Sequence, residues 1–148
     1  MRTLKLFLIS TFLISISSCK KDSTNSENTF ELLTSAPWKT IEQSWNPSNT
    51  GWSDFYAGIP TCLKDNTITY RSDLTCISDE ALTKCNSSDP QTTTGTWSLH
   101  SNNSKYSVTI NGNTTEYEIL ELTTQTLKVY FKTTSPPHVT EYKATLVH

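Results

Sequence analysis

The stretch KYSVTINGNTTEYEILELTTQTLKVYFK, residues 105–132, decides the fold class. Apolar and polar residues alternate along residues 105–110, 114–122 and 126–132, and this period of two is typical of strands with one buried face. Asn111-Gly112 separates the first two segments and is a strong signal for a two-residue hairpin turn. The polar residues 123–125 separate the second and third segments. The stretch therefore predicts three consecutive antiparallel strands.

The same alternation recurs on both sides of this stretch. We expect five further strands, at residues 38–45, 66–71, 74–78, 95–99 and 139–147. Threonine is the commonest residue, and Ala, Met and Arg are scarce, which favours strands over helices. Only residues 30–35 resemble a helical turn. About eight strands at hairpin spacing predict an all-β antiparallel meander that closes into a barrel.

The apolar phase of each strand predicts the side chains that point into this barrel. They are Ile68, Tyr70, Trp97, Leu99, Tyr106, Val108, Ile110, Tyr117, Ile119, Leu127, Val129, Phe131, Tyr142 and Leu146. A barrel of eight strands is either filled by its own side chains or wide enough for one small apolar molecule. The aromatic bulk favours a filled core, and both interpretations stay open.

Residues 1–18 predict a signal peptide. Arg2 and Lys5 precede an apolar run, which small serines follow. This run is much shorter than the roughly 20 residues that a transmembrane helix needs. Residues 16–19, Ile-Ser-Ser-Cys, resemble the lipobox of bacterial lipoproteins, in which the cysteine is lipidated and becomes the N-terminus. Several acyl chains on Cys19 would anchor the chain stably to a bacterial membrane.

The resemblance to a lipobox implies a location in the cell envelope. We expect a lipid anchor in the outer membrane, with the protein on either its periplasmic or its surface face. Residues 20–29 contain no apolar residue, so we expect a lipidated cysteine and flexible tether at 19–30, before a single barrel domain at 31–148. Loss of the leader lowers the formal net charge from −2 to −4, which excludes nucleic acid as an expected partner.

Three cysteines remain once Cys19 carries lipid. Loop-closure entropy gives about 3 kcal/mol for any pairing and cannot choose among them. The strands at 66–71 and 74–78 must form a hairpin with either a two-residue or a three-residue loop. In both registers Cys85 is the thiol nearest Cys62 at the open end, so we predict a Cys62–Cys85 disulfide in an oxidising compartment. Cys76 is left free, and its face of the sheet is undecided because a one-residue slip reverses it.

Several motifs then resemble the small lipocalin-like domain lipoproteins of Gram-negative bacteria. They are DFYAGIPTC at 54–62, KDN at 64–66, KCNSSDPQT at 84–92 and GTWSL at 95–99. The likeness runs from about Leu32 to Leu146 and implies a lipocalin-type barrel on a lipid tether, with Cys62 and Cys85 matching two family cysteines. The family commonly has glycine where this chain has Leu74. Leucine disfavours positive φ, so a different turn is expected here. The resemblance implies no catalytic residue and no particular ligand.

Catalytic and metal-binding patterns are missing from the sequence. His100, His138 and His148 have no paired spacing, and the four glycines form no phosphate-binding loop. No Ser-His-Asp order stands on a recognisable elbow. We therefore expect no enzyme activity, no cofactor and no metal site.

Binding is the remaining function. The long connection at 46–61 contains Trp52, Phe55 and Tyr56. We expect this connection either to plug one end of the barrel or to act as a mobile gate for a ligand. The plug is favoured, because burial of these aromatic side chains removes a large apolar area from water. With Tyr70 and Trp97, these three residues are the candidate contacts for a small hydrophobic ligand. The leading prediction is a membrane-tethered, non-catalytic ligand-binding lipoprotein. The alternative is a structural lipoprotein with a filled core that contacts an envelope protein partner.

Overall fold

The computed structural model describes residues 23–148, with side chains from residue 28 onward. The predicted signal peptide and the lipidation site at Cys19 lie outside these residues. In chain order the described elements are α1 (Ser23–Thr34), β1 (Trp38–Pro47), β2 (Ser53–Asp54), η1 (Tyr56–Gly58), α2 (Thr61–Lys64), β3 (Thr67–Tyr70), β4 (Thr75–Asp79), β5 (Thr92–His100), β6 (Lys105–Ile110), β7 (Asn113–Leu122), β8 (Thr126–Ser135) and β9 (His138–Val147).

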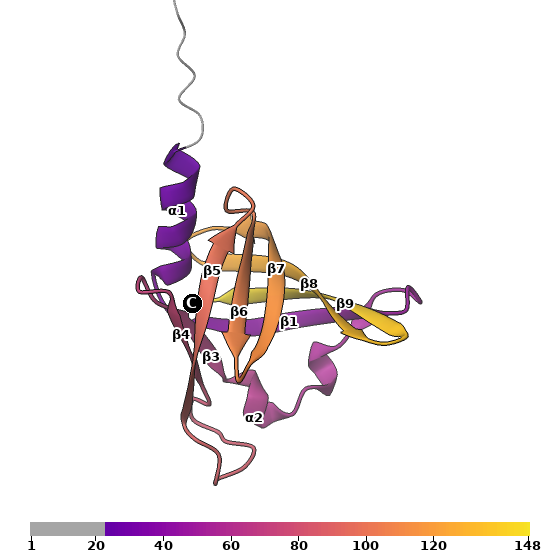
Figure 1. Ribbon diagram of the computed structural model, residues 1–148. Coiled ribbons are helices and arrows are strands. Elements are labelled where there is room, and N and C mark those ends of the chain that lie inside the picture. Colours follow the sequence, from indigo (N-terminus) through magenta and orange to yellow (C-terminus); the bar gives the residue numbers. More distant parts are fainter. Residues whose placement is uncertain (1–22) are drawn as a thin grey trace, which may run out of the picture.

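Eight of these strands close into an antiparallel barrel (Figure 1). Strands β3 to β9 are neighbours in sequence order, and β1 completes the circle by pairing with both β9 and β3. Strand β2 adds two residues beside the end of β1. The pairing between β1 and β3 joins Trp38 to Ile68 and Lys39 to Thr67, and is much shorter than the pairing between β1 and β9. The seam between β1 and β3 is therefore the weakest part of the barrel wall.

This architecture confirms the predicted fold class, and each of the eight predicted strands is present. The helical turn expected at residues 30–35 is the end of a longer helix, since α1 begins at Ser23, inside the stretch predicted to be a tether. Among residues 23–148, no helix has both the length and the hydropathy needed to span a membrane.

Helix α1 packs against one end of the barrel (Figure 1). Leu33 and Trp38 are both fully buried, and the Trp38 Nε1 donates a hydrogen bond of 3.0 Å to the Leu33 carbonyl oxygen. Phe30 stacks on Trp97 with 5.4 Å between ring centroids. Full burial of one such side chain stabilises the fold by about 1.5–3 kcal/mol, so these contacts fix α1 on the barrel.

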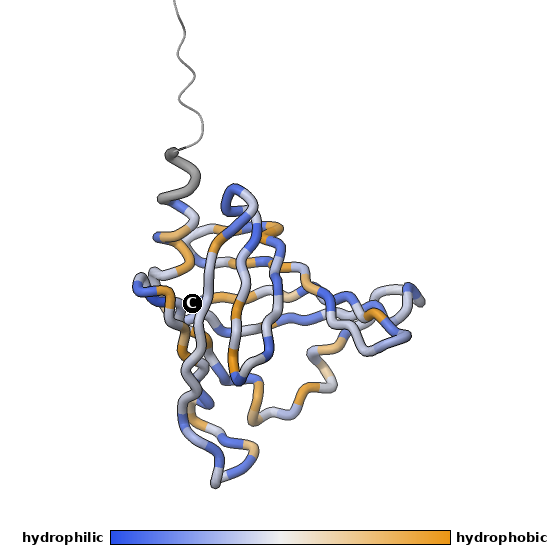
Figure 2. The backbone as a smooth tube through the Cα atoms, viewed as in Figure 1, coloured by the Kyte–Doolittle hydropathy of each residue, from blue (hydrophilic) through white to orange (hydrophobic). Residues whose placement is uncertain are grey.

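The inner face of the barrel carries the predicted core. Hydrophobic and hydrophilic residues alternate along the strands (Figure 2). Apart from Tyr142, the predicted interior side chains belong to the buried cluster or pack against it, and Tyr142 stacks on Phe131 at 4.9 Å. The cluster also contains Leu33, Trp38, Cys76 and Ala144, which the strand phases did not identify.

The β3–β4 hairpin has the three-residue loop and not the two-residue one. Tyr70 pairs with Cys76, and the Arg71 backbone N–H donates to the Thr75 carbonyl oxygen at 2.9 Å. Leu74 adopts φ 66°, so the expectation that this leucine would avoid a positive φ is wrong. In this register Cys76 points inward and is fully buried.

The predicted disulfide between Cys62 and Cys85 is confirmed. It joins α2 to the β4–β5 loop, with 5.1 Å between the two Cα atoms. Cys76 is a free thiol, and burial raises its pKa above the ordinary value. The disulfide lies at the barrel end opposite α1. This distal end also holds η1, α2 and the β6–β7 and β8–β9 turns.

Candidate functional site

A row of aromatic side chains crosses the inner face of the barrel. It consists of consecutive cross-strand partners on β6, β7, β8, β9 and β1, namely Tyr106, Tyr117, Phe131, Tyr142 and Trp45. From Tyr106 to Tyr142, neighbouring ring centroids are 4.9 to 5.0 Å apart. Such separations give favourable aromatic contacts. We call this set the aromatic row.

The two ends of the aromatic row differ in burial. Tyr106 is fully buried, and the hydroxyl of the buried Tyr70 donates to its hydroxyl oxygen at 3.3 Å. Burial raises the pKa of both phenols above the ordinary value, so both stay neutral. Tyr142 and Trp45, at the other end of the row, are half-buried. The half of the barrel next to α1 is therefore filled, and the distal half is less completely covered.

A pocket of about 540 Å³ that is partly open to solvent, which we call the inner cavity, lies at the distal end. Its lining residues are Thr40, Gln43, Trp45, Asp54, Phe55, Tyr56, Gly58, Ile59, Pro60 and Leu63. Thr40, Gln43 and Trp45 lie on the inward face of β1, because their partners on β9 are Leu146, Ala144 and Tyr142. The remaining lining residues belong to residues 54–64, which we call the lid segment.

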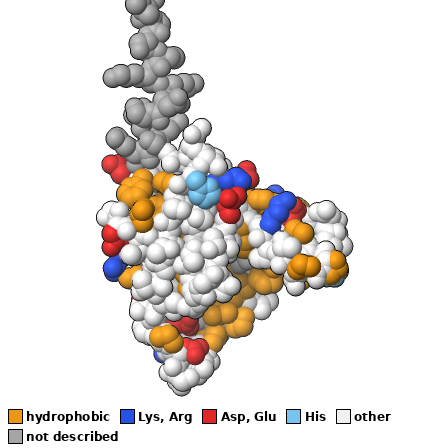
Figure 3. All heavy atoms as spheres, viewed as in Figure 1, with side chains coloured by type: hydrophobic (Ala, Val, Ile, Leu, Met, Phe, Trp, Pro, Cys, Tyr) orange, Lys and Arg blue, Asp and Glu red, His pale blue; other side chains and the backbone are white. Residues whose placement is uncertain are grey.

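The lid segment runs along the edge of β1 that β3 leaves unpaired. The Phe55 backbone N–H donates to the Gln43 carbonyl oxygen at 2.9 Å, and the Tyr56 hydroxyl donates to the Thr40 carbonyl oxygen at 3.2 Å. The Phe55 ring contacts Trp45 and Tyr142, with centroid distances of 5.4 and 5.6 Å. Phe55 thus extends the aromatic row into the lid segment. Hydrophobic side chains gather in this region below the barrel in Figure 3.

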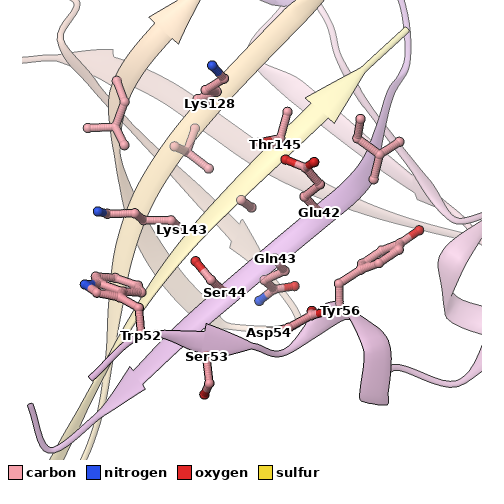
Figure 4. A pocket seen from close by; sticks show the side chains of 14 residues that line it. Glu42, Gln43, Ser44, Trp52, Ser53, Asp54, Tyr56, Lys128, Lys143 and Thr145 are labelled. Atoms are coloured by element: carbon pink, nitrogen blue, oxygen red, sulfur yellow. The ribbon is translucent and has the colours of Figure 1, made fainter. Parts of the chain in front are cut away.

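The outer face of the barrel carries a separate concave surface, which we call the outer groove (Figure 4). Its volume is about 640 Å³, and its lining residues are Ile41, Glu42, Gln43, Ser44, Trp52, Ser53, Asp54, Tyr56, Leu120, Lys128, Val129, Lys143, Ala144 and Thr145. Gln43, Asp54 and Tyr56 line both the groove and the inner cavity. The two spaces therefore lie on opposite sides of the barrel wall at β1.

The structure divides the five predicted ligand contacts among three places. Phe55 and Tyr56 line the inner cavity at the distal end. Trp52 lies in the outer groove, where the Lys143 Nζ is 4.4 Å from its ring centroid. Tyr70 and Trp97 contact each other at 5.3 Å in the filled half of the barrel, beside α1. The five side chains do not form one site.

Thr40, Gln43 and Trp45 were missed as lining residues because β1 is irregular. Trp38 and Trp45 are seven positions apart, so a regular strand would place them on opposite faces. A β-bulge between Thr40 and Glu42 shifts the register and turns both tryptophans inward. The odd spacing of two large aromatic residues in one predicted strand was a signal for such a bulge.

The three histidines are separated from one another in the structure. His148 lies against Trp38 at 3.8 Å between ring centroids, and His138 approaches the Ser48 hydroxyl at 3.4 Å. His100 lies 3.8 Å from a Glu116 carboxylate oxygen. In the described part of the chain, no group of three or more His, Cys, Asp or Glu side chains is placed to hold a metal ion.

Comparison with known proteins identifies the family to which this fold belongs. No curated protein matches the chain. The model of the lipocalin-like domain family matches residues 37–129, from just before β1 into β8. The match covers more than half of the chain, including the lid segment, the disulfide and the β3–β4 hairpin. With its closed eight-stranded antiparallel barrel, the chain belongs to the lipocalin-like domain family.

Proposed function

We propose that this protein is a membrane-tethered lipoprotein that binds a small hydrophobic molecule in the inner cavity and catalyses no reaction. The observation that carries the proposal is the cavity of about 540 Å³ between β1 and the lid segment. This volume lies in the range of about 300–1,000 Å³ that is usual for small-molecule sites. The lipocalin-like fold is a second support, since a barrel of eight strands is wide enough to hold one small ligand where its own side chains do not fill it.

The lining of the cavity suggests the ligand's chemistry. Trp45, Phe55, Ile59, Pro60 and Leu63 supply apolar walls. Gln43 and Thr40 are the uncharged polar side chains on the β1 wall, and the carboxylate of the lining, Asp54, is exposed to water and accepts a hydrogen bond from the Ala57 N–H at 3.0 Å. A largely apolar molecule with one neutral hydrogen-bonding group would match these walls, because it buries apolar area and leaves no buried charge unpaired.

The filled half of the barrel limits where this ligand lies. Trp38, Leu127 and Val129 are fully or almost fully buried on the side of α1. Interiors of this kind are close-packed and admit no further molecule without rearrangement. The ligand is therefore expected at the distal end, against the half-buried end of the aromatic row.

The tether rests on the lipobox-like ending at Cys19. Helix α1 begins at Ser23, shortly after this cysteine, and covers the barrel end opposite the inner cavity. A lipid on Cys19 would keep the α1 end nearer the outer membrane, and the cavity would open away from it. On this arrangement the ligand exchanges with the surroundings or with an envelope partner rather than directly with the anchoring membrane.

Native mass spectrometry of the full chain, purified from its own cells, tests the ligand. We expect a co-purified hydrophobic molecule, retained when the protein leaves its detergent micelle. Leu63→Trp places a larger side chain in the cavity lining and should reduce occupancy by about tenfold. Leu63 is 43% exposed, so this change should leave the fold intact.

Leu82→Trp is the matched control, because Leu82 is 95% exposed and does not line the cavity. Its occupancy should equal that of the unmodified protein. A chain that carries no mass beyond its own acyl groups contradicts the proposal, as does a Leu63→Trp protein that retains the full amount of ligand.

A further inference from the structure

The outer groove contains two β-bulges at the same level of the barrel. In β1 the register shifts between Thr40 and Glu42, and in β7 it shifts between Ile119 and Glu121. Each bulge leaves one extra residue on the outer face, Ile41 in β1 and Leu120 in β7. Bulges re-aim side chains and are frequent beside functional sites.

The two bulges bracket one row of outward-facing residues. Glu42 pairs with Thr145, Thr145 pairs with Lys128, and Lys128 pairs with Glu121. Ile41 lies next to the first member of this row, and Leu120 lies next to the last. The four paired residues of this row are all polar. The combined effect of the bulges is to place an apolar side chain at each end of a polar strip.

Trp52 adds an aromatic wall to the same groove (Figure 4). Its side chain lies beside Lys143, whose Nζ is 4.4 Å from the ring centroid. Such a cation–π contact orients the ring. Ile41, Trp52 and Leu120 are 39%, 42% and 50% exposed, so three apolar side chains in the wall of this concave surface are accessible to a ligand.

Hydrogen bonding in the groove differs from that on the rest of the outer face. Elsewhere, neighbouring strands pair their polar side chains, as in Ser98 with Ser107 at 3.0 Å and Thr109 with Thr114 at 2.8 Å. In the groove the Lys128 Nζ donates to the Glu121 carboxylate at 2.7 Å, whereas, within the described residues, the side chains of Glu42, Ser44, Ser53 and Thr145 make no intramolecular hydrogen bond. These groups are therefore available to a ligand.

We propose that the outer groove is a second binding site, for an uncharged sugar ring or a short neutral oligosaccharide. Two acids, Glu42 and Asp54, and two lysines, Lys128 and Lys143, line the groove, and Lys128 is already paired with Glu121 at 2.7 Å, so the groove offers no cluster of unpaired lysines. An anionic ligand is therefore disfavoured, and a neutral ligand leaves the charged groups in their present contacts. The groove's volume of about 640 Å³ lies in the usual range for small ligands.

A sugar also matches both the apolar side chains and the hydrogen-bonding side chains of the groove. The C–H faces of successive rings of an oligosaccharide pack on Trp52, Ile41 and Leu120, and each hydroxyl both donates and accepts hydrogen bonds. The Glu42 carboxylate and the Ser44 and Thr145 hydroxyls offer complementary partners. A purely aliphatic ligand would remove these polar groups from water without replacing their hydrogen bonds, which is unfavourable.

Saturation-transfer NMR and calorimetry test the site with maltotriose, cellotriose and tri-N-acetylchitotriose. The full chain is kept in a detergent whose headgroup is not a sugar. We expect at least one trisaccharide to bind, and Trp52→Ala to weaken its binding by about tenfold. Ile41→Ser with Leu120→Ser should have a similar effect. All three side chains are exposed, and far-ultraviolet circular dichroism verifies that each variant is folded.

Val139→Ala is the matched control, because Val139 is 42% exposed, like Trp52, but lies outside the groove. It should bind the sugar as the unmodified protein does. Occupancy of the inner cavity, read by native mass spectrometry, should stay the same in the groove variants, so the two sites are tested separately. Three results overturn the proposal: no trisaccharide binds, Trp52→Ala binds equally well, or vesicles of anionic phospholipid bind the groove and displace the sugar.

Discussion

Leu74 adopts a backbone conformation that is unusual for its type. It is the last residue of the β3–β4 loop, has φ 66° and is 47% exposed. The left-handed region costs a side chain with a Cβ roughly 1–2 kcal/mol. The surrounding ladder offsets this cost, since the Leu74 N–H donates to the Arg71 carbonyl oxygen at 3.1 Å and its own carbonyl accepts from the Trp97 N–H at 2.9 Å.

Leu74→Gly should raise the free energy of unfolding by about 1 kcal/mol, because glycine adopts a positive φ without steric cost. Urea denaturation at neutral pH measures the change. Leu82→Gly is the control, since Leu82 is also exposed but has no positive φ, and it should not be more stable than the unmodified chain. A Leu74→Gly protein less stable than the unmodified chain would show that the leucine side chain contributes more than the strain costs.

Gly95 is required by packing rather than by its own φ. It pairs with Cys76 across β4 and β5. A Cβ at this position would lie 2.3 Å from the Thr109 carbonyl oxygen and 3.1 Å from the Cys76 Sγ. The carbonyl belongs to the strand ladder and cannot retreat without disturbing the pairing of β5 with β6. The glycine of the Gly-Thr-Trp motif therefore lets a thiol fill this part of the core.

Two connections at the distal end are fastened to each other. The Cys62–Cys85 disulfide joins α2 to the β4–β5 loop. Nearby, the Asp65 carboxylate accepts hydrogen bonds from the backbone N–H groups of Leu82 and Thr83, at 3.2 and 2.9 Å. The Thr83 hydroxyl donates a further bond of 2.8 Å. These contacts hold the end of the lid segment against the barrel, and so shape the inner cavity.

Asp65 should make stability depend on pH. The Thr83 hydroxyl, and then the backbone donors, hold the pKa of this carboxyl below its usual value of 3.8. A lowered folded-state pKa stabilises the fold above the unfolded-state pKa, and this contribution disappears as pH falls through the folded-state value. The difference in unfolding free energy between the unmodified chain and Asp65→Asn should therefore be largest at neutral pH and shrink in acid.

Urea denaturation at neutral pH and at successive values below 3.8 measures this difference. Glu31→Gln, which removes an exposed carboxylate on α1, is the control for the loss of one negative charge. If Asp65→Asn lowers stability equally at every pH, the side chain acts through its shape and not through its charge.

The barrel is filled by side chains at one end and is accessible to a ligand at the other. Helix α1 covers the filled end, and the lid segment borders the inner cavity at the other. This difference between the two ends of the barrel matters for function because the predicted lipid anchor precedes α1. The ligand site and its tether would then be at opposite ends of the barrel, so that the membrane does not obstruct the cavity.

Lipidation is testable on the full chain in its own cells. Metabolic labelling with an alkynyl fatty acid should mark the unmodified protein and fail to mark Cys19→Ser, because the thioether forms on that sulfur. Cys76→Ser is the matched control and should keep the label, since Cys76 is buried in the barrel. Label retained on Cys19→Ser, or missing from the unmodified protein, contradicts a lipid anchor at this residue.

The sequence by itself determined the fold class, the eight strands and the Cys62–Cys85 pairing. These follow from local signals, since the period of two and the turn residues depend on neighbours along the chain. Phe55 and Tyr56, which the long aromatic connection singled out as candidate ligand contacts, do line the inner cavity, and their contact with a ligand stays a prediction.

Only the tertiary structure decided the residues that share a site. The bulges at Ile41 and Leu120 depend on partner strands, and a shift of one residue reverses the face of every side chain beyond it. Trp45 and Gln43 therefore line the cavity, Trp52 lies in the outer groove, and Tyr70 and Trp97 belong to the filled core. Leu74 accepts its strained φ for the same reason: the strand ladder, which joins residues distant in sequence, outweighs the preference of a single residue.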